Sequence, residues 1–437
     1  MSEENKNKMQ NNLTDKDIEN LNKWAEEHNI EKLKINDKEK IFNLKALFIS
    51  DNKIKHIPAE FFKLTNLKKL LINCDNLIEL SEDIKNLNNL KEFYINCDNL
   101  KRLPKGIWDL INLEVLHIYC NNLESFPNEI EKLTNLKILH IGCNNLNQLP
   151  KESSKKSLLF KNGNIYNFSD IREIMICNEN LKTLPKEIGN FINLERLYIE
   201  NCENLIELPK EIGNLSNLEV IYIKDCKKLK ELPSEIGNLS KLTIIDIKNC
   251  KSIKSLPNEI GNLTNLEILN IANCKNLKEL PDGICNLTDI EFLYIESCKK
   301  LRELPEDTNK LKTLCIYFDN LRELPNGIGN LINLKRFVIK CDKLKKLPKE
   351  IGNLTNLPKL NIECKKLKEI PNEIYDKVDI YNILETFKYK KLNSKNKTGF
   401  YRKSKIKNVY EIDRMDNSDI AMAKKRFDAI LNKKWRL

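Results

Sequence analysis

Residues 218–239 read Leu-Glu-Val-Ile-Tyr-Ile-Lys-Asp-Cys-Lys-Lys-Leu-Lys-Glu-Leu-Pro-Ser-Glu-Ile-Gly-Asn-Leu, and this unit decides the fold. Leu218, Ile221 and Ile223 begin it with the apolar alternation that is typical of a short strand. Pro233 cannot donate a hydrogen bond to a sheet, so the strand must end before it. We expect the return segment after Pro233 to form a short helical turn.

The same opening pattern, Leu-x-x-Leu-x-Leu or its Ile variants, starts fourteen times along the 437 residues. The spacing is 23 or 24 residues, except 35 from Leu136 to Ile171 and 21 from Ile290 to Leu311. One unit of this length cannot bury enough apolar surface to offset the entropy lost on ordering it. The units must therefore stack into one array, rather than the three or so domains that the length alone suggests. The repeats begin at Leu44, Leu67, Leu90, Leu113, Leu136, Ile171, Leu194, Leu218, Leu242, Leu266, Ile290, Leu311, Leu334 and Leu357.

The units resemble leucine-rich repeats, in the Leu-Pro-x-x-Ile-Gly-x-Leu form of bacterial repeat proteins and of the intracellular Ras-group-related plant family. The resemblance covers residues 44–376, about three quarters of the chain. It implies an α/β fold: a right-handed horseshoe solenoid with a parallel β-sheet on the concave face and short turns or helices on the convex face. It also implies protein binding as the usual role, without naming a partner.

Eleven of the fourteen cysteines stand at one position, three residues before the leucine that follows the strand. In leucine-rich repeats this position points inward, so we expect buried thiols rather than disulfides. A zinc cluster is disfavoured because Cys-x-x-Cys pairs are absent, and we predict no metal or cofactor. Cys177 and Cys315 fall at concave positions and are predicted to be the more reactive thiols. The eleven are Cys74, Cys97, Cys120, Cys143, Cys202, Cys226, Cys250, Cys274, Cys298, Cys341 and Cys364.

The central residue of each strand should point outward from the concave face. Seven of these fourteen residues are aromatic or His, in a chain with only 7% Phe, Trp and Tyr. Strands favour aromatic residues whether or not they bind anything, but such a concentration is also typical of an interface. We therefore predict protein-binding contacts from Tyr94, His117, Tyr119, His140, Tyr198, Tyr222, Tyr294 and Tyr317.

His117 and His140 should be neighbours, which raises the question of a metal or an acid–base pair. No carboxylate or nucleophile stands at the matching concave positions, so we expect neither. The chain also lacks a Gly-rich phosphate loop, Gly-x-Ser-x-Gly and His-Glu-x-x-His. A ligase domain of the kind some bacterial leucine-rich-repeat effectors carry would need a catalytic cysteine, yet none follows Cys364. The protein is predicted not to be an enzyme.

The segments outside the repeats have distinct compositions. Residues 1–13 are polar and predicted to be disordered, with no apolar signal segment after Met1, which favours a cytoplasmic location. Residues 14–43 are predicted to form a helical cap with Thr14 as N-cap. The irregular unit at 136–170 is either a functional loop or a decayed repeat.

Residues 377–437 contain 17 Lys or Arg against 7 Asp or Glu, whereas the remainder holds 57 against 56. We therefore expect electrostatic binding only from this tail. Within it, residues 388–410 combine basic and aromatic side chains, so nucleic acid is an alternative partner and an anionic membrane surface another. A C-terminal cap with a solvated linker, ended by an amphipathic helix from Ser418 to Trp435, explains the composition equally. Candidate anion contacts are Lys388, Lys390, Lys391, Arg402, Lys403, Lys405 and Lys407.

Overall fold

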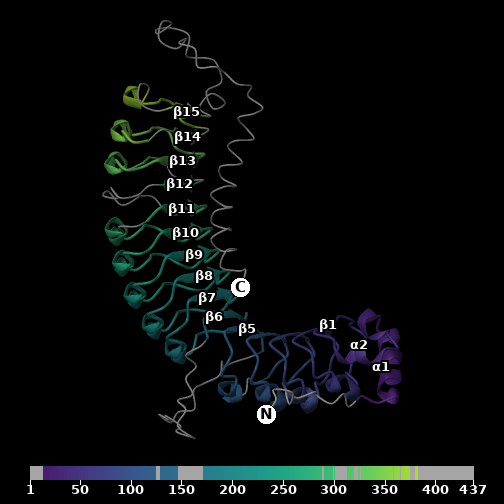
Figure 1. The fold of residues 1–437 in the computed structure, drawn as a ribbon. Coiled ribbons are helices and arrows are strands. Elements are labelled where there is room, and N and C mark those ends of the chain that lie inside the picture. Colours follow the sequence, from purple (N-terminus) through teal and green to yellow (C-terminus); the bar gives the residue numbers. More distant parts are fainter. Residues whose placement is uncertain are drawn as a thin grey trace, which may run out of the picture. The chain divides into compact units, whose positions relative to one another are not determined.

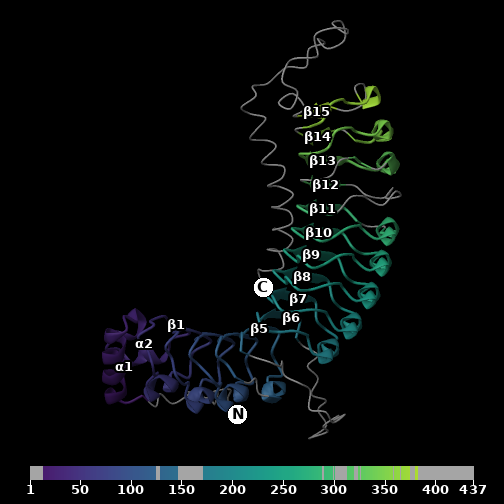
Figure 2. The ribbon, with the colours of Figure 1, turned by 180° about the vertical axis from the view of Figure 1, so that it is seen from behind.

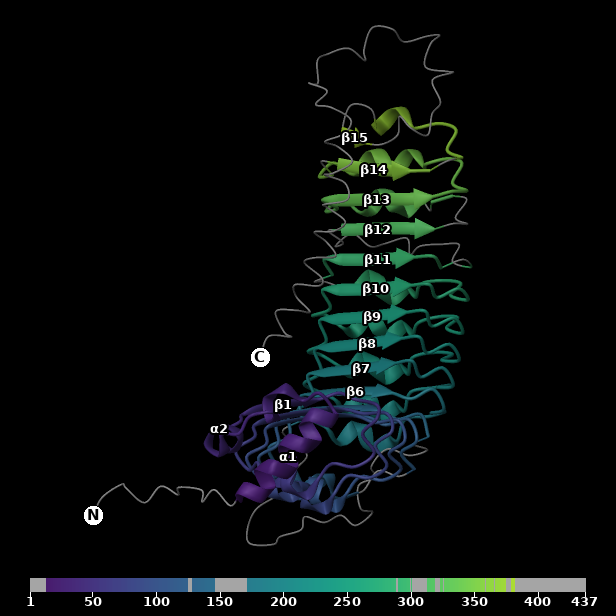
Figure 3. The same ribbon diagram turned by 90° about the vertical axis from the view of Figure 1, so that its right-hand side faces the viewer.

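In the part of the chain that the structure describes, fifteen strands form a single parallel sheet, in which every strand pairs with the next one along the chain (Figure 1). The computed structural model describes residues 13–124, 128–145, 171–287, 290–298, 300, 313–318, 323–324, 326–357, 359–364, 366–374 and 379–381. Figure 3 views the sheet from its strand face, where successive strands run in the same direction. The strands are β1 (Ala46–Ile49), β2 (Lys69–Asn73), β3 (Glu92–Asn96), β4 (Val115–Tyr119), β5 (Ile138–Gly142), β6 (Glu173–Cys177), β7 (Arg196–Glu200), β8 (Val220–Lys224), β9 (Ile244–Lys248), β10 (Ile268–Ala272), β11 (Phe292–Glu296), β12 (Thr313–Phe318), β13 (Arg336–Cys341), β14 (Lys359–Glu363) and β15 (Asp379–Tyr381).

Wherever the structure describes the return segment of a coil, the chain returns from the strand face through a single turn of 3₁₀-helix (Figures 1 and 2). In the unit at 218–239 the turn is Ser234–Asn238, and Pro233 precedes it as N-cap with φ of −68°. This confirms the right-handed solenoid, with the sheet on its concave face and short helices on its convex face. The turns are η3 (Ala59–Lys63), η4 (Glu82–Asn86), η5 (Lys105–Asp109), η6 (Asn128–Lys132), η8 (Lys186–Asn190), η9 (Lys210–Asn214), η10 (Ser234–Asn238), η11 (Asn258–Asn262), η12 (Asp282–Asn286), η13 (Asn326–Asn330), η14 (Lys349–Asn353) and η15 (Asn372–Ile374).

The core lies between the sheet and the helical turns and consists of one ring of aliphatic side chains per coil. Leu218, Ile221, Ile223 and Leu229 are completely buried in theirs. Gly237 is required where two coils touch, because a Cβ there would lie 2.5 Å from the Glu259 carbonyl oxygen of the next coil. Stacking therefore supplies the burial that one repeat lacks.

The cysteines form a column along the inside of the turn that follows each strand. All fourteen are thiols, and the eleven at the repeat position are buried. The thiol of Cys226, a weak donor, lies 3.7 Å from the Ile199 carbonyl oxygen of the preceding coil and 3.5 Å from the Lys224 carbonyl oxygen. Burial raises the pKa of the Cys97 thiol to about 12. The column therefore serves the packing of the turns.

Coils of 24 residues differ from coils of 23 by one residue placed between the strand and the cysteine. In a 23-residue coil, the Cys97 N–H donates directly to the Tyr119 carbonyl. In the 24-residue coils, the extra residue takes this hydrogen bond, as Asp225 does with Lys248, and adopts a positive φ. Asn, Asp and Gly tolerate this left-handed conformation best, which explains the residue types. The extra residues are Asn201 (52°), Asp225 (56°), Asn249 (58°) and Asn273 (57°), and Ser297 (52°) stands at the same position in the shorter coil that begins at Ile290.

Two helices cover the first coil: α1 (Asp15–Glu27) and α2 (Lys38–Phe42), with a 3₁₀ turn, η2 (Glu31–Leu33), between them. As predicted, Thr14 is the N-cap of α1, where it forms a capping box with Asp17. Asp17 also accepts from Lys63 Nζ at 2.8 Å, which ties the cap to the first coil. Leu21 and Ala25 are fully buried beneath the helix.

The sheet extends past residue 376, since β15 pairs with β14. The chain divides into two compact units, Met1–Thr386 and Phe387–Leu437, and the second lies outside the described residues. The proposed disordered N-terminus also lies outside them, apart from Leu13, as does most of the irregular unit. In the part of the chain that the structure describes, no helix has the length and apolarity needed to cross a membrane.

Candidate protein-binding surface

The central residues of the strands form one row across the concave face, which we call the central row. Strand pairing places Tyr94 beside His117, His117 beside His140, and Tyr198 beside Tyr222. The row continues across the irregular unit, because His140 pairs with Met175. The neighbour relationships that the repeat spacing predicted are confirmed.

Tyr94, His117 and His140 form a stack across β3, β4 and β5. The ring centroids lie 4.3 Å apart for Tyr94 and His117, and 4.0 Å apart for His117 and His140, with the planes tilted by 47° and 41°. The Tyr94 hydroxyl donates to Glu92 at 3.3 Å. Lys69 pairs with Glu92 at 2.6 Å and lies 5.1 Å above the Tyr94 ring. The stack is thus supported from one side and would lose little side-chain freedom on binding.

A carboxylate contacts His140 from outside the central row, so the expectation about the matching central positions did not cover it. His140 Nε2 donates to Glu173 Oε1 at 3.0 Å, and Arg196 Nε donates to the other oxygen at 2.7 Å. Glu173 is the first residue of β6, two positions before the central row, and its side chain reaches sideways to the neighbouring strand. His140 and Glu173 are only 4% and 8% exposed.

The electrostatics of this cluster favour a neutral His117 imidazole near the ion pair that Glu173 forms with Arg196. Burial, together with repulsion from His140, lowers the pKa of His117 to about 3. Burial acts to raise the pKa of Glu173, but hydrogen bonds from His140 and Arg196 outweigh it, so the pKa is lowered. Glu173 is therefore ionised and held by Arg196, as expected of an anchor for His140. Among the described residues, no group of three or more His, Cys, Asp and Glu is placed to hold a metal ion.

Tyr119 lies flat across β5 because residue 142 is glycine. A Cβ on Gly142 would come within 2.3 Å of the Tyr119 ring. The Tyr119 hydroxyl reaches the sulfur of Met175, on β6, at 3.5 Å. Burial raises the pKa of Tyr119 to about 12. Tyr119 therefore contributes its ring face to the surface, while its hydroxyl contacts the protein itself.

The other predicted contacts form two further groups. Tyr198 and Tyr222 have centroids 6.0 Å apart, and Lys248 Nζ lies 5.5 Å above the Tyr222 ring. Tyr198 is only 3% exposed, so it offers little area for contact with a partner. Tyr294 and Tyr317 have centroids 5.3 Å apart. The structure thus separates the eight residues into three groups along the sheet.

Four charged residues at the first strand position, Lys69, Glu92, Glu173 and Arg196, escaped the sequence analysis although they support the predicted contacts. The period-2 rule that places the central row on the concave face places these residues there too. The sequence could have indicated them, because two basic and two acidic residues stand at the first position of neighbouring strands, where they can form ion pairs.

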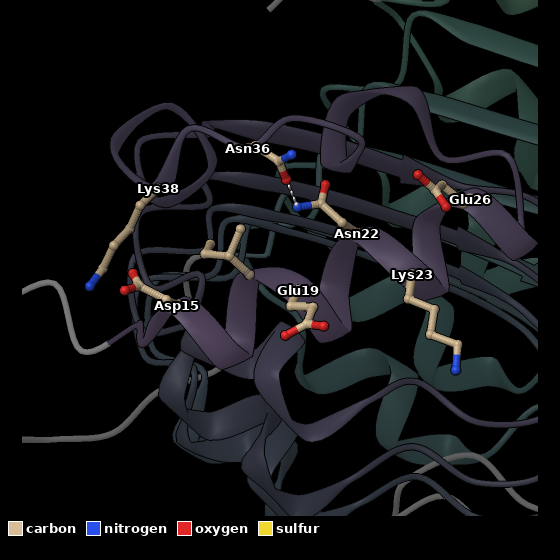
Figure 4. A pocket seen from close by; sticks show the side chains of 8 residues that line it. Asp15, Glu19, Asn22, Lys23, Glu26, Asn36 and Lys38 are labelled. Atoms are coloured by element: carbon tan, nitrogen blue, oxygen red, sulfur yellow. Dashed lines mark hydrogen bonds between the residues drawn. The ribbon is translucent and has the colours of Figure 1, made fainter.

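The predicted anion contacts in the tail, from Lys388 to Lys407, lie outside the described residues and stay a prediction. On the cap, an open groove runs along α1 between Asp15, Glu19, Asn22, Lys23 and Glu26 on one side and Asn36 and Lys38 on the other (Figure 4). Asn22 Nδ2 donates to Asn36 Oδ1 across it at 2.8 Å. The other charged groups do not converge on one point, so the groove suggests no ligand.

A leucine-rich repeat region model matches residues 17–183, 170–278 and 269–388. These matches cover most of the chain, and they agree with the stacked coils, the parallel sheet and the inward cysteine column. The chain belongs to the leucine-rich repeat family. A search of curated proteins found no match.

Among solved structures, the chain is similar to a leucine-rich repeat protein of Leptospira interrogans, with 25% identity, 78% of this chain and 96% of that chain covered, and a TM-score of 0.38. An internalin of Listeria monocytogenes has 18% identity, coverage of 74% and 88%, and a TM-score of 0.46. A chain of the Drosophila Toll–Spätzle complex has 18% identity, coverage of 75% and 40%, and a TM-score of 0.53. The last likeness supports the fold alone.

Proposed function

We propose that this protein is a non-enzymatic interaction module, and that it binds a partner protein on the concave face through Tyr94 and His117, which are stacked on the buried His140. The observation that carries the proposal is the rigidity of this stack, in which ring contacts, the Lys69–Glu92 pair and Glu173 hold the side chains in place. Pre-ordered aromatic side chains are the residues from which binding hot spots are built.

The central row before the stack extends this surface. Phe48 is 56% exposed, and it pairs with Leu71, which pairs with Tyr94. An apolar and aromatic strip thus crosses β1 to β4, and Asn73 and Asn96 lie on its polar flank. An apolar centre with a polar rim is the usual anatomy of a protein interface.

We also propose a cytoplasmic scaffold role for the module. Fourteen cysteines that carry thiols fit a reducing compartment better than an oxidising one. Recovery of native protein with oxidised cysteines from its source cells would contradict this location.

The binding proposal is tested by comparing three immobilised proteins: wild type, Tyr94→Ala/His117→Ala, and a matched control, Ile111→Ala/Ile192→Ala. Ile111 and Ile192 are 55% and 49% exposed and lie on return segments, away from the central row. A partner captured from a lysate of source cells should bind the central-row variant at least about five-fold more weakly, which corresponds to about 1 kcal/mol. The control should match wild type. Equal capture by all three proteins would refute the concave site.

A further inference from the structure

Six lysines lie in the turns that follow strands β8, β9 and β10. Figure 3 shows the edge of the sheet at which these strands end. Each of three consecutive coils contributes one lysine directly after its cysteine and another three residues later. Backbone hydrogen bonds join the second lysines, from Lys254 N to Lys230 O and from Lys278 N to Lys254 O. We call this array the basic ridge: Lys227, Lys230, Lys251, Lys254, Lys275 and Lys278.

The ridge is exposed and largely uncompensated. Five of its lysines are exposed, and within the described residues only Lys227 forms an ion pair, with Glu203 of the preceding coil. The three turns 226–233, 250–257 and 274–281 together hold seven lysines and two glutamates, Glu231 and Glu279, a net charge of +5. Neighbouring coils of a parallel sheet lie ~4.8 Å apart, so these charges are concentrated within a short distance.

Acidic residues lie at the opposite edge of the sheet, before strands β7, β8, β10 and β11. Glu195, Glu219, Glu267 and Glu291 each stand before a strand, and backbone bonds link neighbours, such as Glu219 N to Glu195 O. A five-residue strand separates the two edges by roughly 17 Å, which exceeds the ~8 Å screening length at physiological salt. The near-zero net charge of residues 1–376 therefore conceals a separation of charge across the coils. The sequence analysis expected electrostatic binding only from residues 377–437, because it considered the net charge of the repeats and not the positions of their charges.

The chemistry of the ridge fits phosphate groups. The three turns contain no arginine and no aromatic residue, and Ile253 is buried. Lysine is a compact point charge on a flexible stem that suits phosphate without demanding a fixed geometry. A membrane surface would in addition favour apolar side chains that can insert. A regular line of paired ammonium groups matches a regular line of phosphates, as in a nucleic acid backbone.

We propose that the basic ridge binds the phosphate backbone of nucleic acid without base selectivity. This site is independent of the concave protein-binding surface and of the tail.

The test measures binding of a fluorescein-labelled 20-base-pair DNA duplex to the full-length protein by fluorescence anisotropy, in KCl from about 50 to 300 mM. The ridge variant is Lys230→Gln/Lys254→Gln/Lys278→Gln. The matched control, Lys186→Gln/Lys210→Gln/Lys349→Gln, removes three exposed lysines from the convex turns η8, η9 and η14 and has the same net charge. A tail variant, Lys403→Gln/Lys405→Gln/Lys407→Gln, separates the ridge from the tail.

The ridge variant should bind at least about ten-fold more weakly at 100 mM KCl, and its slope of log K against log[KCl] should be less steep by about 2–3, since each phosphate contact contributes about 0.9. The control should stay within about two-fold of wild type, and a shuffled duplex should bind like the first one. The ridge effect should persist in the tail variant background. Three results would each overturn the proposal: no duplex binding by wild type, equal losses in ridge and control variants, or ridge-dependent binding to phosphatidylserine vesicles without duplex binding.

Discussion

Glu173 Oε1 lies 3.0 Å from His140 Nε2, although 33 residues separate them in the chain. The contact forms because β6 follows β5 in the sheet despite the irregular unit between them. It joins the aromatic stack to Arg196 on β7. The irregular unit thus leaves the concave face continuous.

Replacing Glu173 by Gln should lower the free energy of unfolding by about 2–3 kcal/mol, because Arg196, whose side chain is 13% exposed, loses a charged partner. Urea unfolding at about pH 7 measures the change. Glu195→Gln is the control, since its 3.3 Å contact with Arg196 and its pair with Arg172 are more exposed and should matter by less than about 1 kcal/mol. Equal effects of the two substitutions would contradict the central role of Glu173.

The neutral His117 should make stability depend on pH. Its pKa is about 3 in the folded protein and 6.5 without the fold, so below pH 6.5 the unfolded chain binds a proton that the folded chain does not. Stability should therefore decrease as the pH falls from about 6.5 towards 3. Between about pH 5 and 6.5, the His117→Phe variant should lose less stability than wild type. Denaturant titrations of both proteins across this range measure the effect as the difference between their curves, because the two proteins share every other ionisable group. Parallel curves for the two proteins would exclude a buried neutral His117.

The left-handed residues of the 24-residue coils should discriminate between glycine and alanine. Asn249 has a φ of 58°, and its side chain donates to Asp225 at 2.8 Å. Glycine and alanine both remove this hydrogen bond, but only alanine carries a Cβ into the left-handed region. Asn249→Ala should thus be less stable than Asn249→Gly by about 1 kcal/mol in thermal or urea unfolding. The opposite order would rule out this conformation at residue 249.

Thiol titration of the native protein should give a fast phase from Cys177 and Cys285, the two cysteines that are half-buried. Cys315, expected from its concave position to react readily, is 9% exposed, and burial raises its pKa to about 11. It lies in the central row between Tyr294 and Val338. Cys177→Ala/Cys285→Ala should abolish the fast phase, whereas Cys315→Ala should leave it intact. A fast phase that survives the double substitution would mean that the buried column is accessible.

The sequence by itself determined the coil, the strand register and the order of the central row. These follow from local rules: apolar alternation, a proline before the return turn in all but one coil (Ser81), and a spacing that recurs. Thr14 could also be predicted as the N-cap of α1, because capping depends on four adjacent residues.

Only the tertiary structure decided which side chains meet across strands, how much of each is exposed, and where charges gather. Glu173 reaches His140 by leaning sideways, and Gly142 lets Tyr119 lie flat, because residues distant in the sequence become neighbours at strand spacing. The 24-residue period indicates that these coils contain one extra residue. That this residue lies directly after the strand is seen only in the structure, where its N–H donates to a carbonyl of the next coil. The basic ridge appears only when coils are stacked, since it is built from lysines 24 residues apart.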